Sequence, residues 1–394
     1  MIRHIWFICG FIYSTVSSYG AIDIIFDYSY DTGNYFGDEQ RYIMEQVAYV
    51  FESKMGGTSF TGTRPLEDVG VNGVTAKLNF DNPTTDTNIQ PLIGSTTSDG
   101  NVIGRQDELI IFLGARSHGF SSSNVLASAG QTGTAWSWTS ASDKDAWLAV
   151  KNAKNTSSLY QPIAGVSQVN TAHSFYFDTD LTTHADAEVS GKYDFYTIMV
   201  HEIGHIMGFN THNAWNANLS GSNWIGTEAM KQYSLQNPPN GEAVPLVSST
   251  NPHWNLDLNY GKVNCGCHPS MLPEVNYNYR ASFSDLDFAL LKDIGYSISD
   301  NPTGTNIGGT YSVVRNGSNA NGNYSITGTY DIPVSMSYAD WLSAGNGGNG
   351  SGGFVSSGSA APEPAYIFTL LGGALTFLSG RKNLGKIKSL LNIS

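Results

Sequence analysis

The chain has 394 residues, more than one typical domain, and 40% of them are hydrophobic, which is enough for a sizeable core. Only 13% are charged, 43 are glycine and the formal net charge is −13, a composition typical of a loop-rich, exported globular protein. This acidity excludes nucleic acid as an expected partner, because binding phosphates requires a basic surface.

Residues 1–20 are typical of a secretory signal peptide. A basic start precedes an apolar run, Ile5–Tyr13, and Ser18-Tyr19-Gly20 supplies a small-x-small cleavage site before Ala21. We therefore expect the chain to be exported.

The next stretch carries strand and helix patterns in alternation. Ala21–Tyr30 alternates apolar and polar residues, which predicts a strand. Apolar residues at helical spacing between Phe36 and Met55, followed by Gly56-Gly57, predict a helix. Further strands are expected at Val74–Phe80, Asp107–Leu113 and His173–Phe177.

Two more helices are predicted, at Lys192–Phe209 and Asp285–Ile294, and the sequence between them is mostly irregular. Strands and helices thus precede the first of these helices, and loops follow it. The pattern predicts an α+β fold with a cleft between an upper sheet half and a lower, looped half.

The first of these helices contains His201-Glu202-Ile203-Gly204-His205, an H-E-x-x-H motif. Residues four apart lie on one face of a helix, so His201 and His205 can bind one metal ion together. Glu202 stands beside them as the expected general base for a metal-bound water. The motif predicts a zinc hydrolase.

A catalytic zinc ion usually has three protein ligands, so one more must come from elsewhere. In the compact pattern H-E-x-x-H-x-x-G-x-x-H, Gly208 is in place but position 211 is Thr, and His212 comes one residue late. A one-residue shift in a tight turn re-aims the side chain. His212 remains one alternative, and Glu228, in the manner of thermolysin-like enzymes, is another.

Downstream motifs resemble those of the leishmanolysin-type metzincins. After HEIGHIMGF come Val244-Pro245-Leu246, His253-Trp254, Ser270-Met271-Leu272 and then Ser284–Tyr296, in that order. The resemblance implies that His253 is the third zinc ligand and that Met271 forms the Met-turn beneath the metal. It covers residues 190–300 well and the N-terminal half in outline. The many-cysteine framework of the protozoan members is absent from this sequence.

The resemblance further implies a metzincin-like zincin fold: a twisted mixed sheet and a metal-bearing helix over a cleft, with a loop-rich C-terminal subdomain. The implied activity of residues 21–300 is a zinc-dependent endopeptidase that acts on protein or peptide substrates, with Zn²⁺ as cofactor and Glu202 as catalytic base. The strand at His173–Phe177 is the expected docking edge for an extended substrate. The alternative is a catalytically inactive zincin scaffold serving as a surface or matrix protein, although such a scaffold needs no general base.

Two cysteines, Cys265 and Cys267, remain once the signal peptide is removed. An even number suits an oxidising compartment. A small disulfide, free thiols and a second metal site with His268 all remain open for this pair.

Residues 301–360 are rich in Gly, Ser, Asn and Thr and predict a flexible linker. Alternation at Gly309–Ile332 leaves open a small hairpin within it.

Residues 361–394 begin with Pro362-Glu363-Pro364, continue with the apolar run Ala365–Gly380 and then reach Arg381-Lys382. This combination resembles the PEP-CTERM sorting signal of Gram-negative bacteria. The resemblance implies a transmembrane helix that anchors the chain transiently in the inner membrane, followed by cleavage by an exosortase-type processing enzyme. The expected destination is the periplasm and outer membrane or the extracellular surface.

Overall fold

The structure is a computed structural model that describes residues 22–55, 73–105, 107–181, 191–234, 243–246, 251–255, 269–275, 280–299, 305–315 and 324–346. All of them belong to the first of two compact units, Met1–Ser351. The predicted signal peptide, the two cysteines and the PEP-CTERM segment lie outside the described residues. Within the described ranges, no helix combines the length and the apolar character needed to cross a membrane.

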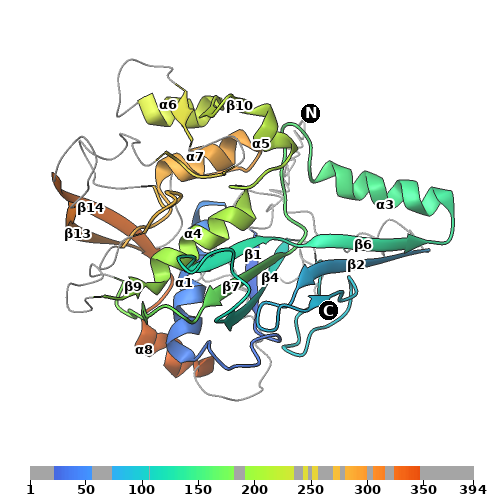
Figure 1. Ribbon diagram of the computed structural model, residues 1–394, viewed down its shortest axis with the longest axis horizontal. Coiled ribbons are helices and arrows are strands. Elements are labelled where there is room, and N and C mark those ends of the chain that lie inside the picture. Colours follow the sequence, from blue (N-terminus) through green and yellow to red (C-terminus); the bar gives the residue numbers. More distant parts are fainter. Residues whose placement is uncertain are drawn as a thin grey trace, which may run out of the picture. The chain divides into compact units, whose positions relative to one another are not determined.

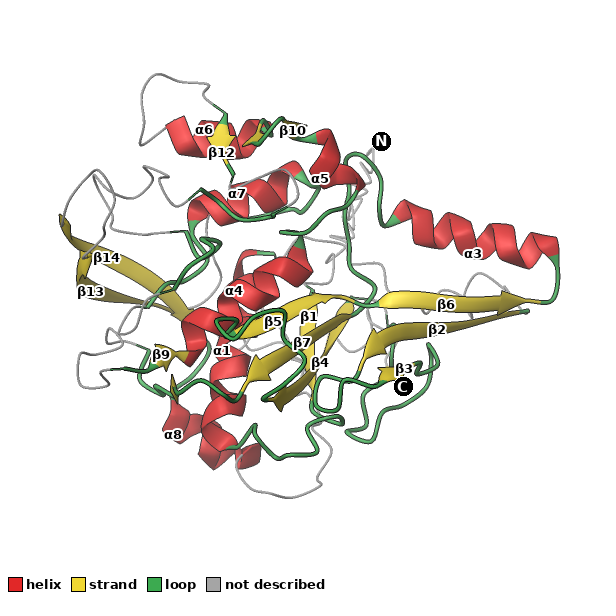
Figure 2. Ribbon diagram, viewed as in Figure 1, coloured by secondary structure: helices red, strands yellow, loops and turns green. Residues whose placement is uncertain are grey.

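The described residues form an α+β fold, in which helices surround several small sheets, and the predicted class is confirmed at this level (Figures 1 and 2). The helices are α1 Asp38–Lys54, α3 Ala141–Ala153, α4 Phe195–Met207, α5 Asn213–Ala217, α6 Thr227–Ser234, α7 Asp285–Asp293 and α8 Tyr338–Trp341, which a π-helical turn, Leu342–Asn346, follows.

The main sheet has four strands in the order β1-β4-β7-β5. They are β1 Asp23–Asp27, β4 Glu108–Arg116, β7 Gly165–Asn170 and β5 Ala127–Gln131. The first three run parallel, and β5 pairs antiparallel with β7 at the edge. A central parallel strand is buried on both faces, which explains the unbroken apolar run Leu109–Leu113 in β4.

Alternate residues of β4 contribute to two separate cores. Leu109, Ile111 and Leu113 face the large core that contains α1 and α4. Ile110 and Phe112 face a smaller core with side chains of β2. The zinc-motif helix α4 therefore rests on a rigid layer made by the main sheet and α1, and a rigid layer is what a precise site requires.

The remaining strands form smaller sheets. The strands β2 Val74–Asp81, β3 Asn88–Ile89 and β6 Gly133–Trp138 make a second sheet, which extends with α3 to the right of the main sheet in Figure 1. The others are the pair β8 Phe175–Tyr176 and β9 Tyr193–Asp194, the trio β10 Leu219–Ser220, β11 Asn223–Trp224 and β12 Val244–Pro245, and the hairpin β13 Thr305–Arg315 and β14 Tyr324–Val334.

Part of the segment expected to be a linker is folded. The hairpin β13–β14 and α8 precede the glycine-rich stretch, and the Tyr42 hydroxyl of α1 donates a hydrogen bond to the Met336 carbonyl (2.9 Å). The Trp341 ring is buried beside the Tyr42 ring, with centroids 6.0 Å apart. Composition predicted a linker because few of these residues are large and apolar, yet Tyr338 and Trp341 pack this segment on Tyr42 of α1.

Acidic side chains gather where α1 meets β1. The Glu52 carboxylate accepts a hydrogen bond from the Ile24 amide (2.7 Å). Burial, with smaller contributions from the charges of Asp23 and Glu45, raises the pKa of Glu52 to about 8, although the hydrogen bond from Ile24 acts in the opposite direction. Because this pKa exceeds the unfolded value of 4.5, the folded protein loses stability as the pH rises from 4.5 through about 8.

Replacing Glu52 with Gln removes that cost and keeps an oxygen for the Ile24 amide. We expect Tm at pH 8.5 to rise by about 2–4 °C, the shift that corresponds to about 1 kcal/mol in a domain of this size. The gain should vanish at pH 3.5, where the carboxyl group is protonated in both states. Thermal unfolding at the two pH values measures this, with the exposed Glu39→Gln on the same helix as control; equal Tm values at pH 8.5 would refute the prediction.

Candidate metal centre

The start of α4 is fixed by a buried ionic group. The Asp194 carboxylate caps the helix, accepting hydrogen bonds from the amide (3.2 Å) and hydroxyl (2.6 Å) of Thr197. The Arg280 guanidinium donates to both Asp194 oxygens (3.1 and 2.9 Å) and to Asp178 (2.8 Å). Since Arg280 precedes α7, this group ties the start of α4 to the segment that leads into α7.

The end of α4 requires glycine at position 208. Gly208 has φ +155°, and a Cβ there would lie 2.2 Å from the Ile294 side chain. The chain turns sharply, and the amides of Gly208 and Phe209 both donate to the Gly204 carbonyl. This turn brings the Phe209 carbonyl to His205, whose Nδ1 lies 2.7 Å from it.

Three histidines meet at the surface of α4. His201 Nε2 lies 3.1 Å from His205 Nε2 and 3.2 Å from His253 Nε2. His253 comes from the segment 251–255, far along the chain, and each of the three residues offers a ring nitrogen within 4.8 Å of the others. The three histidines are therefore close enough to bind one metal ion. His201 is buried, and the other two are half-buried.

The second ring nitrogen of each histidine faces an oxygen. His201 Nδ1 lies 2.8 Å from the Ser270 carbonyl, His205 Nδ1 faces the Phe209 carbonyl, and His253 Nδ1 faces the Asn251 side-chain oxygen. Backbone carbonyls only accept hydrogen bonds, so the Nδ1 atoms carry the protons and the Nε2 lone pairs converge. Converging lone pairs repel one another unless a cation lies between them, so this donor set fits a metal ion.

Burial keeps these imidazoles neutral, the form that binds metals. It lowers the pKa of His201 to about 3, with a further contribution from His205. It lowers the pKa of His253 to about 2, with contributions from both other histidines, and it also lowers the pKa of His205. No proton therefore competes for the Nε2 atoms near neutral pH.

Glu202 lies beside the histidines and is 7% exposed. Burial raises its pKa to about 8, and a hydrogen bond from the Ala129 amide acts in the opposite direction. A bound dication nearby would favour the charged carboxylate. Ala129 belongs to β5, the edge strand of the main sheet, so the edge runs along the side of the site.

The strand predicted at His173–Phe177 as the docking edge for a substrate does not belong to the main sheet. Only Phe175–Tyr176 forms a strand, β8, and it pairs parallel with β9 in a small separate sheet. Among the described strands, β5 has the most extensive contact with α4. Sequence pattern missed β5 because its residues, ASAGQ, are small or polar and show no alternation.

His212, the alternative third ligand, is not in this group. Its Nδ1 accepts a hydrogen bond from the Trp215 amide (3.0 Å) as the cap of α5, and its Nε2 lies 3.1 Å from the Gly208 carbonyl. Its ring stacks on Tyr160, with centroids 3.9 Å apart. Both nitrogens are occupied, so the residue has a structural place in the turn after α4.

Met271 packs directly beneath the metal helix. It is fully buried, and a Cβ on Gly204 would lie 2.5 Å from its sulfur and 2.8 Å from the Phe283 ring. The glycine in the zinc motif therefore allows this close approach.

Replacing Gly204 with Ala should destabilise the protein by about 1–2 kcal/mol, because overpacking costs about 1–3 kcal/mol and the better helix propensity of Ala returns at most about 1. Urea unfolding measures the loss. Gly33→Ala is the control, since nothing lies within 4 Å of a Cβ there. A Gly204→Ala protein as stable as the control would contradict this packing.

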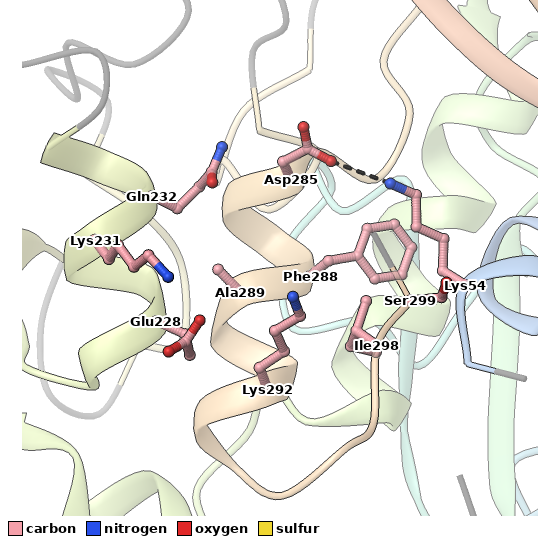
Figure 3. Close-up of a pocket in the computed structure, with 10 residues that line it drawn as sticks. All are labelled: Lys54, Glu228, Lys231, Gln232, Asp285, Phe288, Ala289, Lys292, Ile298 and Ser299. Carbon is pink, nitrogen blue, oxygen red and sulfur yellow. Dashed lines mark hydrogen bonds and ion pairs between the residues drawn. The ribbon is translucent and has the colours of Figure 1, made fainter. Parts of the chain in front are cut away.

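A separate cavity of about 340 Å³ lies between α6 and α7 (Figure 3). Its walls include Glu228 and the ion pair between Lys54 and Asp285 (3.1 Å), but none of the three histidines. Glu228, considered from sequence as a metal ligand, lines this cavity instead (Figure 3).

Comparison of the chain with protein-family models, curated proteins and solved structures finds no match. What the protein does must follow from the chemistry of its own residues.

Proposed function

We propose that the chain is a zinc-dependent endopeptidase of the leishmanolysin-like metzincin type. The observation that supports this most strongly is the convergence of three unprotonated Nε2 atoms, from His201, His205 and His253, beside the buried carboxyl group of Glu202. Three protein ligands with one position open for water are typical of catalytic rather than structural zinc sites.

The residues present favour zinc over harder cations. Magnesium and calcium prefer oxygen ligands, whereas three imidazoles suit zinc and similar transition metals. The Nδ1 contacts to Ser270, Phe209 and Asn251 would orient the rings and raise their basicity.

The proposed reaction is hydrolysis of a peptide bond by water. A zinc ion held by the three histidines would lower the pKa of its water and polarise the scissile carbonyl. Glu202 accepts the proton from the attacking water and donates it to the leaving amine. No covalent intermediate with the protein is needed, and Glu202 returns to its starting form.

An extended substrate would pair with the edge of β5 that faces away from β7, which has no partner strand among the described residues. This strand borders α4, and its Ala129 amide faces Glu202. Backbone pairing binds many sequences in one register and places a peptide bond over the site. Pairing through the main chain suits a protein or peptide substrate better than a small molecule, because a peptide offers backbone groups that pair with a strand.

The proposed destination rests on the two ends of the sequence. Residues 1–20 would direct export, and residues 361–394 would anchor the chain transiently in the inner membrane until an exosortase-type enzyme releases it. The enzyme would then act at the periplasm and outer membrane or the cell surface.

Hydrolysis by the purified, exported chain tests the proposal. A library of fluorogenic peptides and an unfolded protein should be cleaved, cleavage should stop with a zinc chelator, and added zinc should restore it. Zinc-loaded protein that cleaves neither substrate would instead support an inactive scaffold. Cleavage that persists with the metal fully removed would refute the proposed chemistry.

A further inference from the structure

Asp287, in the first turn of α7, is completely buried and accepts an unusual set of hydrogen bonds. One oxygen accepts from the Trp254 indole N–H (2.7 Å). The other accepts from the Ser270 amide (2.9 Å) and from the amide and hydroxyl of Ser284 (2.7 and 2.8 Å). Capping α7 requires only the Ser284 contacts, so the other two need a separate explanation.

Both additional partners, Ser270 and Trp254, are directly connected to the proposed metal ligands. Ser270 presents its carbonyl to His201 Nδ1 (2.8 Å). Trp254 follows His253 in the chain and is fully buried. The two segments also bind each other, since the Trp254 amide donates to the Met271 carbonyl (2.9 Å).

The remaining ligand, His205, is connected to Trp254 through the packing of Trp254 on Phe209. The Trp254 ring lies edge-on to the Phe209 ring, with centroids 5.3 Å apart. Phe209 presents its carbonyl to His205 Nδ1 (2.7 Å). The indole that Asp287 holds therefore stands between the loop that carries one ligand and the turn that orients another.

We propose that Asp287 is the positioning residue of the metal centre: it fixes Trp254, and with it His253, and it holds the Ser270 carbonyl against His201. The inference rests on the proposed function, because it assumes that these histidines bind a metal. A carboxylate suits the role, since one side chain offers two oxygens to several donors at once, and hydrogen bonds to a charged acceptor are roughly twice as strong as neutral ones.

The other end of α7 provides a matched control. Asp293 accepts from the Trp224 indole N–H (3.0 Å) and from the amides of Glu228 (2.7 Å) and Ala229 (3.0 Å). Asp293 is half-buried, and its donors are of the same kinds as those of Asp287 on the same helix. These partners belong to β11 and α6 and contact none of the three histidines.

The test compares Asp287→Asn with Asp293→Asn in the full chain. Asn has the same shape but replaces one acceptor oxygen with a donor, so some N–H groups lose their partner. Zinc affinity is measured by competition with a chromophoric chelator, and the geometry of the site by the visible absorption spectrum of the cobalt(II) form. We expect zinc binding about 10–100-fold weaker and an altered cobalt spectrum for Asp287→Asn only.

Each outcome has a distinct meaning. Wild-type affinity and spectrum in Asp287→Asn would overturn the proposal, and so would an equal loss in both variants, which would indicate general destabilisation. A wild-type protein that binds neither metal would refute the proposed function itself. If Asp287→Asn does not fold, Trp254→Phe removes the indole N–H together with part of the ring and should still weaken zinc binding. Trp224→Phe makes the same change at an equally buried tryptophan and should not. Equal zinc affinities of these two variants would overturn the proposal.

Discussion

Replacing Glu202 with Gln is expected to lower peptide hydrolysis by about 10²–10⁴-fold, the usual contribution of a general base, while zinc stays bound. Gln keeps the shape and the hydrogen bond from the Ala129 amide, but it cannot accept a proton. Because the donor set consists of the three histidines and does not include Glu202, the zinc affinity should stay within a few-fold of wild type. The measurement is kcat/KM on a fluorogenic peptide together with zinc content.

Glu228→Gln is the matched control for this variant. Glu228 is a glutamate on a helix like Glu202, but it lines the cavity between α6 and α7. The Glu228→Gln protein should hydrolyse the peptide at the wild-type rate. Undiminished hydrolysis by Glu202→Gln would refute the mechanism, and loss of zinc from this variant would show that Glu202 serves as a ligand.

Replacing His253 with Ala should have the second large effect, on metal binding. It removes one of three ligands, so zinc affinity should fall by on the order of 10³-fold, beyond the 10–100-fold typical of changes behind the ligands. Peptide hydrolysis at low zinc should disappear with it. Equilibrium competition for zinc measures the change.

His212→Ala separates the two histidines that the sequence left in competition. It removes the cap of α5 and the stack on Tyr160, which together should cost about 1–3 kcal/mol of stability. Its zinc affinity should equal that of wild type. The reverse result, with zinc lost in His212→Ala and retained in His253→Ala, would rule out the three-histidine group as the metal centre.

Local patterns were sufficient for the helices and strands that carry strong periodicity. The spacing in the HEIGH motif predicted two imidazoles on one face of a helix, and the pattern of Asp107–Leu113 predicted the strand that the structure shows as β4. The amphipathic pattern of Asp285–Ile294 likewise predicted α7, and the structure shows that Ser284 and Asp287 form a capping box at its start.

The rest depends on contacts between distant segments. His253 approaches α4 in a short loop that is held by the indole of Trp254 on Asp287, 33 residues away. The acceptors for the Nδ1 atoms of His201 and His205 are backbone carbonyls. Every residue has a backbone carbonyl, so the sequence does not indicate which ones bind the histidines. The resemblance to leishmanolysin-type metzincins singled out His253 through the HW pair, whereas residue chemistry alone left several histidines open.

X-ray absorption at the zinc edge of the exported chain, as purified, tests the three-histidine centre most directly. We expect one zinc per chain, with about three imidazole nitrogens and one further light atom at about 2.0–2.1 Å. His253→Ala should reduce the imidazole contribution by one third. A chain without zinc, or a zinc with sulfur ligands at about 2.3 Å, would contradict a centre built from His201, His205 and His253.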